Sequence, residues 1–345
     1  MFKKIVCALI ATGASLSALA GMPGNPVIPP TGTPLLAADT TGMWSLGIDG
    51  LYLQSTAPEY QYAQVNYASS PANTLKNQSV DSSYHTALGV DATYQFAASD
   101  RDVGFSFMHA DFDDTDTASI SGSQTISDPF GLIPTRRSRV DSIKGETDKL
   151  YNAADIVFGQ VLHVGSSVDL RPFAGMRYAD LNSRNNSTYY NTPQATNPIQ
   201  ATAEMTSHYQ GLGPRAGLDA RFHVGPSVSF VGTVGAALEV GYDKAQTILQ
   251  TNGDLPFTQK LPQTWYVVPE LDARLGIDYQ HAMGVSNSFD VQAGYQVVNY
   301  FSALQEDYQD IQVDGSSVNS TVNQQDFGFH GPYLRAQLNS SVVMV

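Results

Sequence analysis

Charged side chains recur at alternate positions within segments that are otherwise apolar or small. Arg171 and Arg177 are separated by an even number of positions, and so are Arg215 and Arg221. Even spacing places side chains on one face of a β-strand. Because the other face of these segments is apolar, we expect the charges to project into a wet interior. The residues assigned to such a lumen are Arg171, Arg177, Arg215, Arg221, Asp219, Glu239, Glu270, Asp272, Arg274 and Asp278.

These charges allow two interpretations. Arginines on one arc of the wall and carboxylates on the next could create a transverse field that selects ions. With Asp49, Asp91, Asp155 and Asp290 also inward, acids outnumber arginines, which predicts a mild cation preference. Replacing Arg171 and Arg177 by Gln is then expected to increase the cation selectivity of the pore. The other interpretation is that the charges pair and plug a narrow barrel, and for about ten strands both stay open.

Enzymatic chemistry has weaker support. The chain contains no Gly-x-Ser-x-Gly element, no phosphate-binding glycine loop and no zinc-type spacing. The acidic run 111–116 lacks the glycine and distal glutamate of a calcium loop. We therefore expect no enzyme, no cofactor and no metal site. The candidates that could lie near a loop rim are His85, His109, His208 and His330, with Asp111, Asp113, Asp114 and Asp326.

The elements that must position these residues are long strands. Apolar and polar residues alternate over 84–98, 228–242 and 265–279, and a period of two is typical of a strand with one apolar face. No segment shows sustained helical spacing. The expected strands average about 15 residues, whereas soluble strands usually have about 5 or 6, which disfavours a secreted sandwich. The ten expected strands are 43–54, 83–97, 102–112, 147–163, 168–182, 205–223, 228–244, 263–280, 288–302 and 326–340.

The connections alternate between short and long. His163–Val168 and His223–Val228 form similar glycine-containing tight turns, whereas 113–146 and 183–204 are long and polar. This asymmetry is typical of an outer-membrane β-barrel. Ile120, Gln124 and Ile126 hint at extra pairing in the first of these loops, so eight to fourteen strands are allowed. We expect the long loops to be outside the cell.

Aromatic residues on the apolar faces form two groups, one near the short turns and one near the long loops. The separation corresponds to roughly 25–35 Å of tilted strand, the thickness of a bilayer. On this register, Leu271→Arg should impair folding in lipid and Asp272→Arg should be tolerated. The expected girdle residues are Trp44, Tyr52, Tyr84, Tyr94, Phe96, Tyr178, Phe222, Phe230, Tyr242, Trp265, Tyr279, Phe289 and Phe301.

The composition and the N-terminal segment indicate an exported, acidic protein. Lys3 and Lys4, an apolar run and Ala18-Leu19-Ala20 predict a cleaved signal peptide over 1–20. A Pro-rich periplasmic leader over 21–42 and an outer-membrane barrel over 43–345 are expected to follow. The chain has 18 Lys and Arg against 32 Asp and Glu, a net charge of −14, which argues against nucleic-acid binding.

Several ordered motifs resemble those of the Legionella major outer membrane protein and its pore-forming relatives. They are Trp44-Ser45-Leu46-Gly47, Leu51-Tyr52-Leu53-Gln54, Phe158-Gly159-Gln160, the segments 173–179 and 211–217, and Phe329-His330-Gly331-Pro332-Tyr333-Leu334-Arg335. The resemblance implies a pore-forming outer-membrane protein of a gram-negative bacterium. The chain departs from this family in having its one cysteine, Cys7, inside the expected signal peptide.

Together these observations predict an all-β, up-and-down antiparallel transmembrane barrel that passes small hydrophilic solutes or ions. The alternative is a non-conducting structural barrel or a surface adhesin that acts through its long extracellular loops. The expected partners are outer-membrane lipid and small solutes or ions. Host or surface ligands could bind the loops, and no nucleic acid is expected.

Overall fold

The computed structural model describes residues 42–57, 59–67, 74–120, 125–127, 140–191, 199–251, 256–284, 286–311 and 318–342. The expected signal peptide 1–20, and the expected leader up to position 41, lie outside these residues. Among the described residues, no helix is long and apolar enough to cross a membrane.

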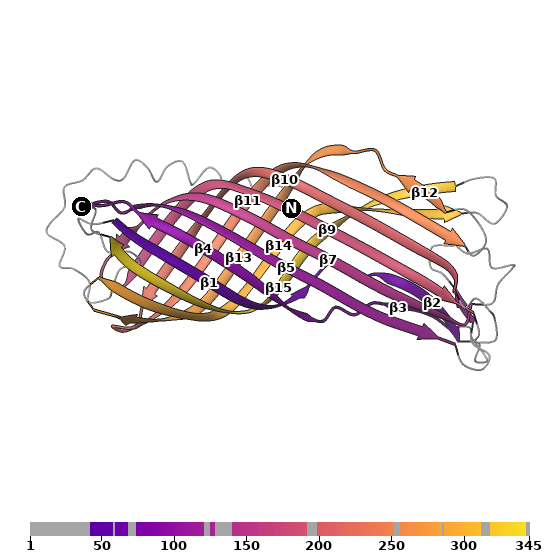
Figure 1. Cartoon of the computed structure of the whole chain (residues 1–345), viewed down its shortest axis with the longest axis horizontal. Coiled ribbons are helices and arrows are strands. Elements are labelled where there is room, and N and C mark those ends of the chain that lie inside the picture. The colour runs from indigo at the N-terminus through magenta and orange to yellow at the C-terminus, as the bar shows by residue number, and fades with distance from the viewer. Residues whose placement is uncertain are drawn as a thin grey trace.

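Ten long antiparallel strands close into a barrel, as predicted (Figure 1). Each pairs with its neighbours in chain order, and pairing of the first with the last closes the ring. Closure matters because every backbone amide and carbonyl inside a bilayer needs a partner. The strands are β1 (Gly42–Ser55), β4 (Tyr84–Gln95), β5 (Arg101–Ser119), β7 (Ser142–Gln160), β9 (Val168–Tyr190), β10 (Ile199–His223), β11 (Val228–Thr251), β13 (Thr264–Ala282), β14 (Asn287–Ile311) and β15 (Val318–Val342).

Side chains alternate between the lumen and the outer surface along each strand. On β13, Leu271 is 51% exposed on the outside, whereas its neighbour Glu270 is 1% exposed on the inside. The alternation of apolar and polar residues in the sequence predicted which side chains point outward. In the structure, the apolar face of each strand is the outward face, as predicted.

The strands at the long-loop end continue well beyond the expected boundaries. β9 runs to Tyr190 and β10 begins at Ile199, so most of the expected loop 183–204 is paired strand. β14 and β15 likewise extend to Ile311 and back from Val318. These extensions lie beyond the outer aromatic girdle, where both faces can be polar, and the sequence alternation that marks a membrane strand is therefore lost.

Short strands complete the long-loop end. A small sheet pairs β2 (Gln61–Tyr67) with β3 (Thr74–Ser79) and β6 (Thr125–Ser127). The expected pairing around Ile126 is therefore real, but it joins this sheet rather than adding a barrel hairpin; Gln124 lies outside the described residues. β12 (Phe257–Lys260) pairs with β11 at this end, whereas β8 (Leu162–Val164) pairs with the start of β9 at the short-turn end.

The small sheet packs against the inner side of the extended wall. The Tyr60 hydroxyl is 2.7 Å from the Ser187 hydroxyl of β9, and the ring of Tyr62 lies against Gly145 of β7. Both tyrosines belong to a buried apolar cluster at this end of the barrel. The loop between β1 and β4 is thus folded onto the barrel mouth.

Candidate functional site in the barrel lumen

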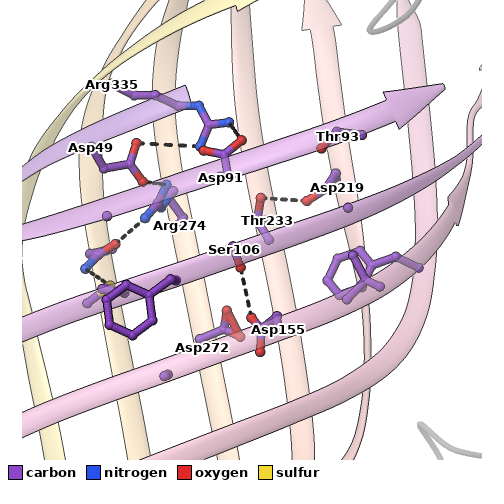
Figure 2. Close-up of a pocket in the computed structure, with 18 of the residues that line it drawn as sticks. Asp49, Asp91, Thr93, Ser106, Asp155, Asp219, Thr233, Asp272, Arg274 and Arg335 are labelled. Atoms are coloured by element: carbon purple, nitrogen blue, oxygen red, sulfur yellow. Dashed lines mark hydrogen bonds and ion pairs between the residues drawn. The ribbon is translucent and has the colours of Figure 1, made fainter. Parts of the chain in front are cut away.

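A polar cavity of about 330 Å³ lies in the barrel lumen. Its walls come from strands on all sides, because inward positions of β1, β4, β5, β7, β9, β10, β11, β13, β14 and β15 line it. Figure 2 shows that the labelled carboxylates and arginines point into this space from different strands.

One group of ion pairs joins β1, β4, β13 and β15 across the lumen. Arg274 Nη1 donates to Asp49 Oδ2 at 2.9 Å, and Arg335 Nη2 donates to Asp91 Oδ2 at 2.7 Å. Arg335 is also 3.5 Å from the other Asp49 oxygen. The two arginines and two carboxylates therefore form one neutral group (Figure 2).

A second group is centred on Arg171 of β9. Its guanidinium donates to both carboxylate oxygens of Asp102 and, at 2.6 Å, to Asp219. Asp219 also accepts a hydrogen bond of 2.8 Å from the Thr233 hydroxyl. Arg171 is thus fixed between β5 and β10.

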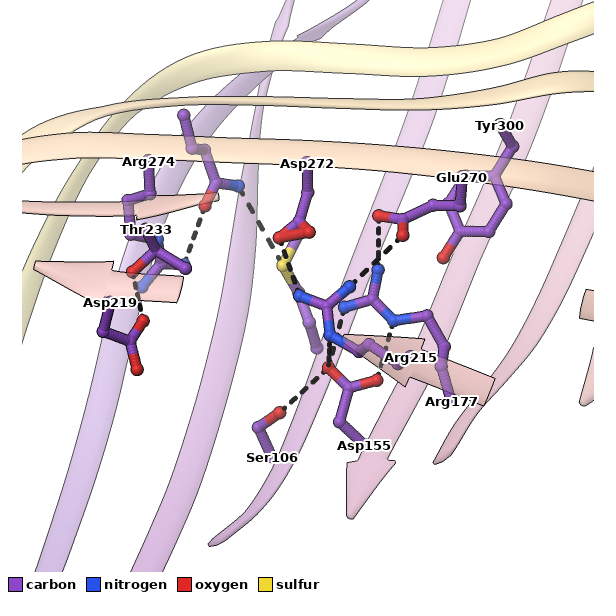
Figure 3. A network of polar contacts seen from close by, with 12 residues as sticks. Ser106, Asp155, Arg177, Arg215, Asp219, Thr233, Glu270, Asp272, Arg274 and Tyr300 are labelled. Atoms are coloured by element: carbon purple, nitrogen blue, oxygen red, sulfur yellow. Dashed lines mark hydrogen bonds and ion pairs between the residues drawn. The ribbon is translucent and has the colours of Figure 1, made fainter. Parts of the chain in front are cut away.

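The third group contains two arginines (Figure 3). Arg177 makes two hydrogen bonds of 2.7 Å to Asp155 and a third to Glu270. Arg215 donates to Glu270 at 3.2 Å and to Asp272 at 2.7 Å. Because Asp272 balances a buried guanidinium, we now expect Asp272→Arg to be destabilising: the substitution would place two cations together in a low-dielectric interior.

Ion pairs also occupy the lumen at the short-turn end. Arg221 lies 3.2 Å from Asp278. Asp169 accepts contacts from His163 at 2.6 Å and from His223 at 2.8 Å. Every arginine assigned to the lumen therefore has a carboxylate partner in the structure.

The structure accordingly favours the paired interpretation of these charges. All ten residues assigned to the lumen lie on inward positions, but the charges of nine of them, all except Glu239, are paired and do not form separate positive and negative arcs. Arg171 and Arg177 hold carboxylates, so we no longer expect their replacement only to tune ion preference. Sequence reasoning missed Asp102 and Arg335 as members; their even offsets from inward neighbours on β5 and β15 could have identified both.

A layer of apolar and aromatic side chains fills the lumen on the long-loop side of the cavity. Tyr151 and Phe329 pack with ring centroids 4.8 Å apart, and the Tyr151 and Tyr300 hydroxyls are 3.3 Å apart. Inward residues of the layer are 0–2% exposed, so no water-sized path passes between them in the described part of the chain. The layer consists of Leu53, Phe112, Tyr151, Leu181, Tyr209, Val268, Tyr300, Phe327 and Phe329.

Glu239 lies at the level of this layer and is fully buried. Neither of its side-chain oxygens has a hydrogen-bond partner among the described residues. The Tyr209 hydroxyl donates to the backbone carbonyl of Glu239 at 3.2 Å. Glu239 is thus inward, as predicted, but it faces packed side chains rather than the cavity.

The upper parts of β14 and β15 form a hairpin that reaches across part of the lumen beyond the aromatic layer. The hairpin begins at a bulge where Ser302 has a φ of 55° and the β14–β15 register shifts. The Gln305 amide then donates to Ser207 Oγ on β10 at 3.0 Å, and Asn185 of β9 donates to Glu306 at 2.7 Å. The hairpin therefore reaches the inner face of the wall formed by β9 and β10.

The rim histidines do not form a catalytic relay. His85 Nε2 contacts both Ser83 Oγ at 3.0 Å and Asp114 Oδ1 at 3.1 Å, and Ser83 also bonds Asp114 directly. In a Ser–His–Asp triad the acid and the serine use different ring nitrogens. Burial would raise the pKa of Asp114, but the hydrogen bonds from Ser83 and His85 outweigh it and hold this pKa below its usual range.

The other rim candidates are dispersed over the outer surface. His109 contacts Asn152 at 2.8 Å, His208 contacts Asp180 at 2.8 Å, and His330 contacts the hydroxyl of Tyr295. Asp326 holds the bulge by accepting from the Ser302 amide at 2.8 Å. Asp111 and Asp113 face the exterior of β5.

The predicted girdle residues all lie on the outside of the barrel. Trp44 and Tyr94 pack together at 4.9 Å between ring centroids in the girdle near the short turns, and Tyr52 and Tyr84 stack at 5.0 Å in the other. Leucine, valine and isoleucine side chains between the girdles are exposed, for example Val240 at 50%. An apolar band bounded by aromatic residues on a closed barrel defines a surface that faces membrane lipid.

These features define the class of the protein: it is a gram-negative outer-membrane β-barrel. Residues 37–340 match the family model described as Legionella pneumophila major outer membrane protein precursor. The match covers most of the chain, so the protein belongs to this family.

The chain is also similar to several solved structures, each at a low sequence identity. The outer membrane protease OmpT of Escherichia coli is 9% identical, with a TM-score of 0.44, covering 90% of this chain and 100% of the protease. A Pseudomonas aeruginosa FadL homologue is 8% identical, with a TM-score of 0.27 and coverage of 87% and 90%. The Yersinia pestis attachment invasion locus protein Ail is 12% identical, with a TM-score of 0.21 and coverage of 87% and 99%. No curated protein sequence matches the chain.

Proposed function

We propose that this protein is an outer-membrane barrel with a closed lumen that acts as a structural anchor or surface-binding protein. In this proposal the long-loop end faces the exterior of the cell and carries the function, and the chain is not an enzyme. The observation that supports it is the layer around Tyr151, Tyr300 and Phe329, whose side chains exclude water across the lumen. The paired charges beneath this layer act as a second filling, as expected for a narrow barrel.

A planar-bilayer recording on the refolded barrel tests this proposal. We expect no steady conductance from the wild type, because the aromatic layer leaves no wet path. Tyr151→Ala/Phe329→Ala should conduct in small steps, because it joins the cavity of about 330 Å³ to the long-loop end. Circular dichroism and heat-modified gel migration would establish that this variant folds. A steady wild-type conductance would refute the closed barrel.

A second candidate is a gated pore for small hydrophilic solutes or ions. The cavity supports it, because the cavity is polar and lies directly below the layer. The β14–β15 hairpin also supports it, because the hairpin is attached through a bulge at Ser302 and contacts the far wall through the Gln305 amide and Ser207. Displacement of the hairpin, together with the rings of Tyr300 and Phe327 at its base, would open the lumen from the long-loop side.

The two candidates can be separated with a disulfide. Ser207→Cys/Gln305→Cys should fasten the hairpin to β10, and the sole native cysteine, Cys7, lies in the expected signal peptide. A gated pore predicts intermittent wild-type conductance that disappears in the oxidised variant and returns on reduction. A closed barrel predicts silence in both redox states. Ser207→Ala/Gln305→Ala, which cannot crosslink, is the matched control.

A further inference from the structure

A group of basic residues lies on the outside of the barrel just beyond the aromatic girdle at the long-loop end. Outward positions of β11 run from Phe230 in one girdle to Tyr242 in the other, and Lys244 is the next. At about 3.3 Å per residue and about 40° of tilt, Lys244 stands about 5 Å beyond Tyr242. This is the height at which lipid head groups meet the hydrocarbon.

Strand register brings two more basic residues to the same place. His208 of β10 is directly opposite Lys244, and Lys260 of β12 is opposite Gln246, the next outward residue of β11. Directly opposed residues lie about 5 Å apart and successive outward residues about 7 Å apart. Long lysine side chains on these positions can reach a single ligand. We call His208, Lys244 and Lys260 the basic patch.

Hydrogen bonds and a ring contact hold the basic patch in place. The Lys244 ammonium lies 5.2 Å from the ring centre of Tyr242, whose hydroxyl donates to Gln210 at 2.7 Å. Gln210 donates to Asp180 at 2.9 Å, and Asp180 also contacts His208 at 2.8 Å. The network joins three strands and orients the side chains below the two lysines.

The two lysines have no ion-pair partner among the described residues. In the part of the chain that the structure describes, neither Lys244 nor Lys260 has a carboxylate within 4.0 Å. On the same outer surface, Arg184 lies 2.7 Å from Glu204 and is paired. Two adjacent cations that lack an acid partner among the described residues are notable in a chain whose net charge is −14, and they are complementary to an anion.

We propose that the basic patch binds a phosphate group of an outer-leaflet lipid. The assignment to the outer leaflet rests on the proposed orientation of the barrel. A phosphate at head-group height can accept from both ammonium groups, and lysine binds phosphate as a point charge. An anionic lipid surface strengthens binding about fivefold for each nearby lysine, so we expect about 25-fold for two.

The fluorescence of Trp265 offers a direct reading of this site. Its ring packs on Tyr242 with centroids 5.3 Å apart, next to the basic patch. The chain has two tryptophans, and a Trp44→Phe background leaves Trp265 as the reporter. The refolded barrel in neutral detergent would be titrated with a phosphorylated glycolipid, with the same glycolipid after removal of its phosphates, and with inorganic phosphate.

The double variant Lys244→Gln/Lys260→Gln should bind the phosphorylated glycolipid about 25-fold more weakly than the parent. Lys76→Gln/Arg101→Gln removes the same charge from exposed positions elsewhere and should leave the affinity unchanged. The dephosphorylated glycolipid should bind parent and variant equally weakly.

Three results would overturn the proposal. Equal affinity for the two glycolipids would exclude phosphate recognition, and equal losses in both double variants would reduce the effect to overall charge. If inorganic phosphate saturates the basic patch and the phosphorylated glycolipid binds no more tightly, the patch is a site for a free anion and not for a lipid. None of these results depends on whether the lumen conducts.

Discussion

Replacement of Arg177 by Gln should destabilise the barrel strongly. Arg177 is 6% exposed and makes two hydrogen bonds to Asp155 and one to Glu270. Charge-assisted hydrogen bonds contribute about 1.5–3 kcal/mol each, but breaking one buried ion pair typically costs about 3–5 kcal/mol in total. For Arg177→Gln we expect a loss of about 3–5 kcal/mol, the range for one broken ion pair, and not the sum over three hydrogen bonds. The reason is that Arg215 still contacts both Asp155 and Glu270, the carboxylates that lose Arg177.

The assay is reversible urea unfolding in lipid vesicles, arranged as a double-mutant cycle. Arg177→Gln, Asp155→Asn and their combination would be compared with the wild type. The combination should cost less than the sum of the single changes by about 1–3 kcal/mol, because it leaves no uncompensated charge at that contact. Arg101→Gln, a change at an exposed residue that has no ion pair with any described residue, should stay within about 0.5 kcal/mol.

Two outcomes would contradict this reasoning. A cost below about 1 kcal/mol for Arg177→Gln would mean that water already solvates the arginine, as in an open pore. Strict additivity in the cycle would mean that Arg177 and Asp155 do not interact. Either result would support the interpretation in which the lumen is open and its charges are separate and hydrated.

Three further predictions concern the lipid face, the rim and the small sheet. Leu271→Arg should cost about 2–4 kcal/mol in vesicles, because the cation would lie in hydrocarbon; a cost no larger than that of Leu271→Ala would contradict the outward placement. Asp114 has a lowered pKa, so its contribution is complete at neutral pH and is lost as pH falls through the folded-state value, below about pH 4. Asp114→Asn should therefore be less stable at pH 7 and should show a shallower loss on acidification; parallel stability curves against pH would oppose this. Gly145→Ala should displace the ring of Tyr62 and loosen the small sheet, measured as faster limited proteolysis than in Gly225→Ala, whose added methyl group meets no other atom within 4 Å.

The sequence by itself predicted about ten barrel strands, with eight to fourteen allowed, and the orientation of their side chains. Because lipid lies on one side of each strand and a polar lumen on the other, apolar and polar residues must alternate. The alternation from Trp265 to Tyr279 therefore predicts which side chains face lipid and which face the lumen. The girdle positions follow from the same constraint. The sequence did not predict where the strands end on the long-loop side. A strand segment such as 183–190 has polar residues on both faces once it leaves the membrane, so the alternation is lost.

Only the tertiary structure decided whether the lumen charges stay apart or combine. Arg274 meets Asp49 at a sequence separation of 225 residues, and Arg335 meets Asp91 at 244. Such contacts depend on closure and on the stagger of the strands around the ring, neither of which appears in local periodicity. The aromatic layer has the same origin, because inward Tyr151, Tyr300 and Phe329 become neighbours only when a narrow barrel brings opposite walls together.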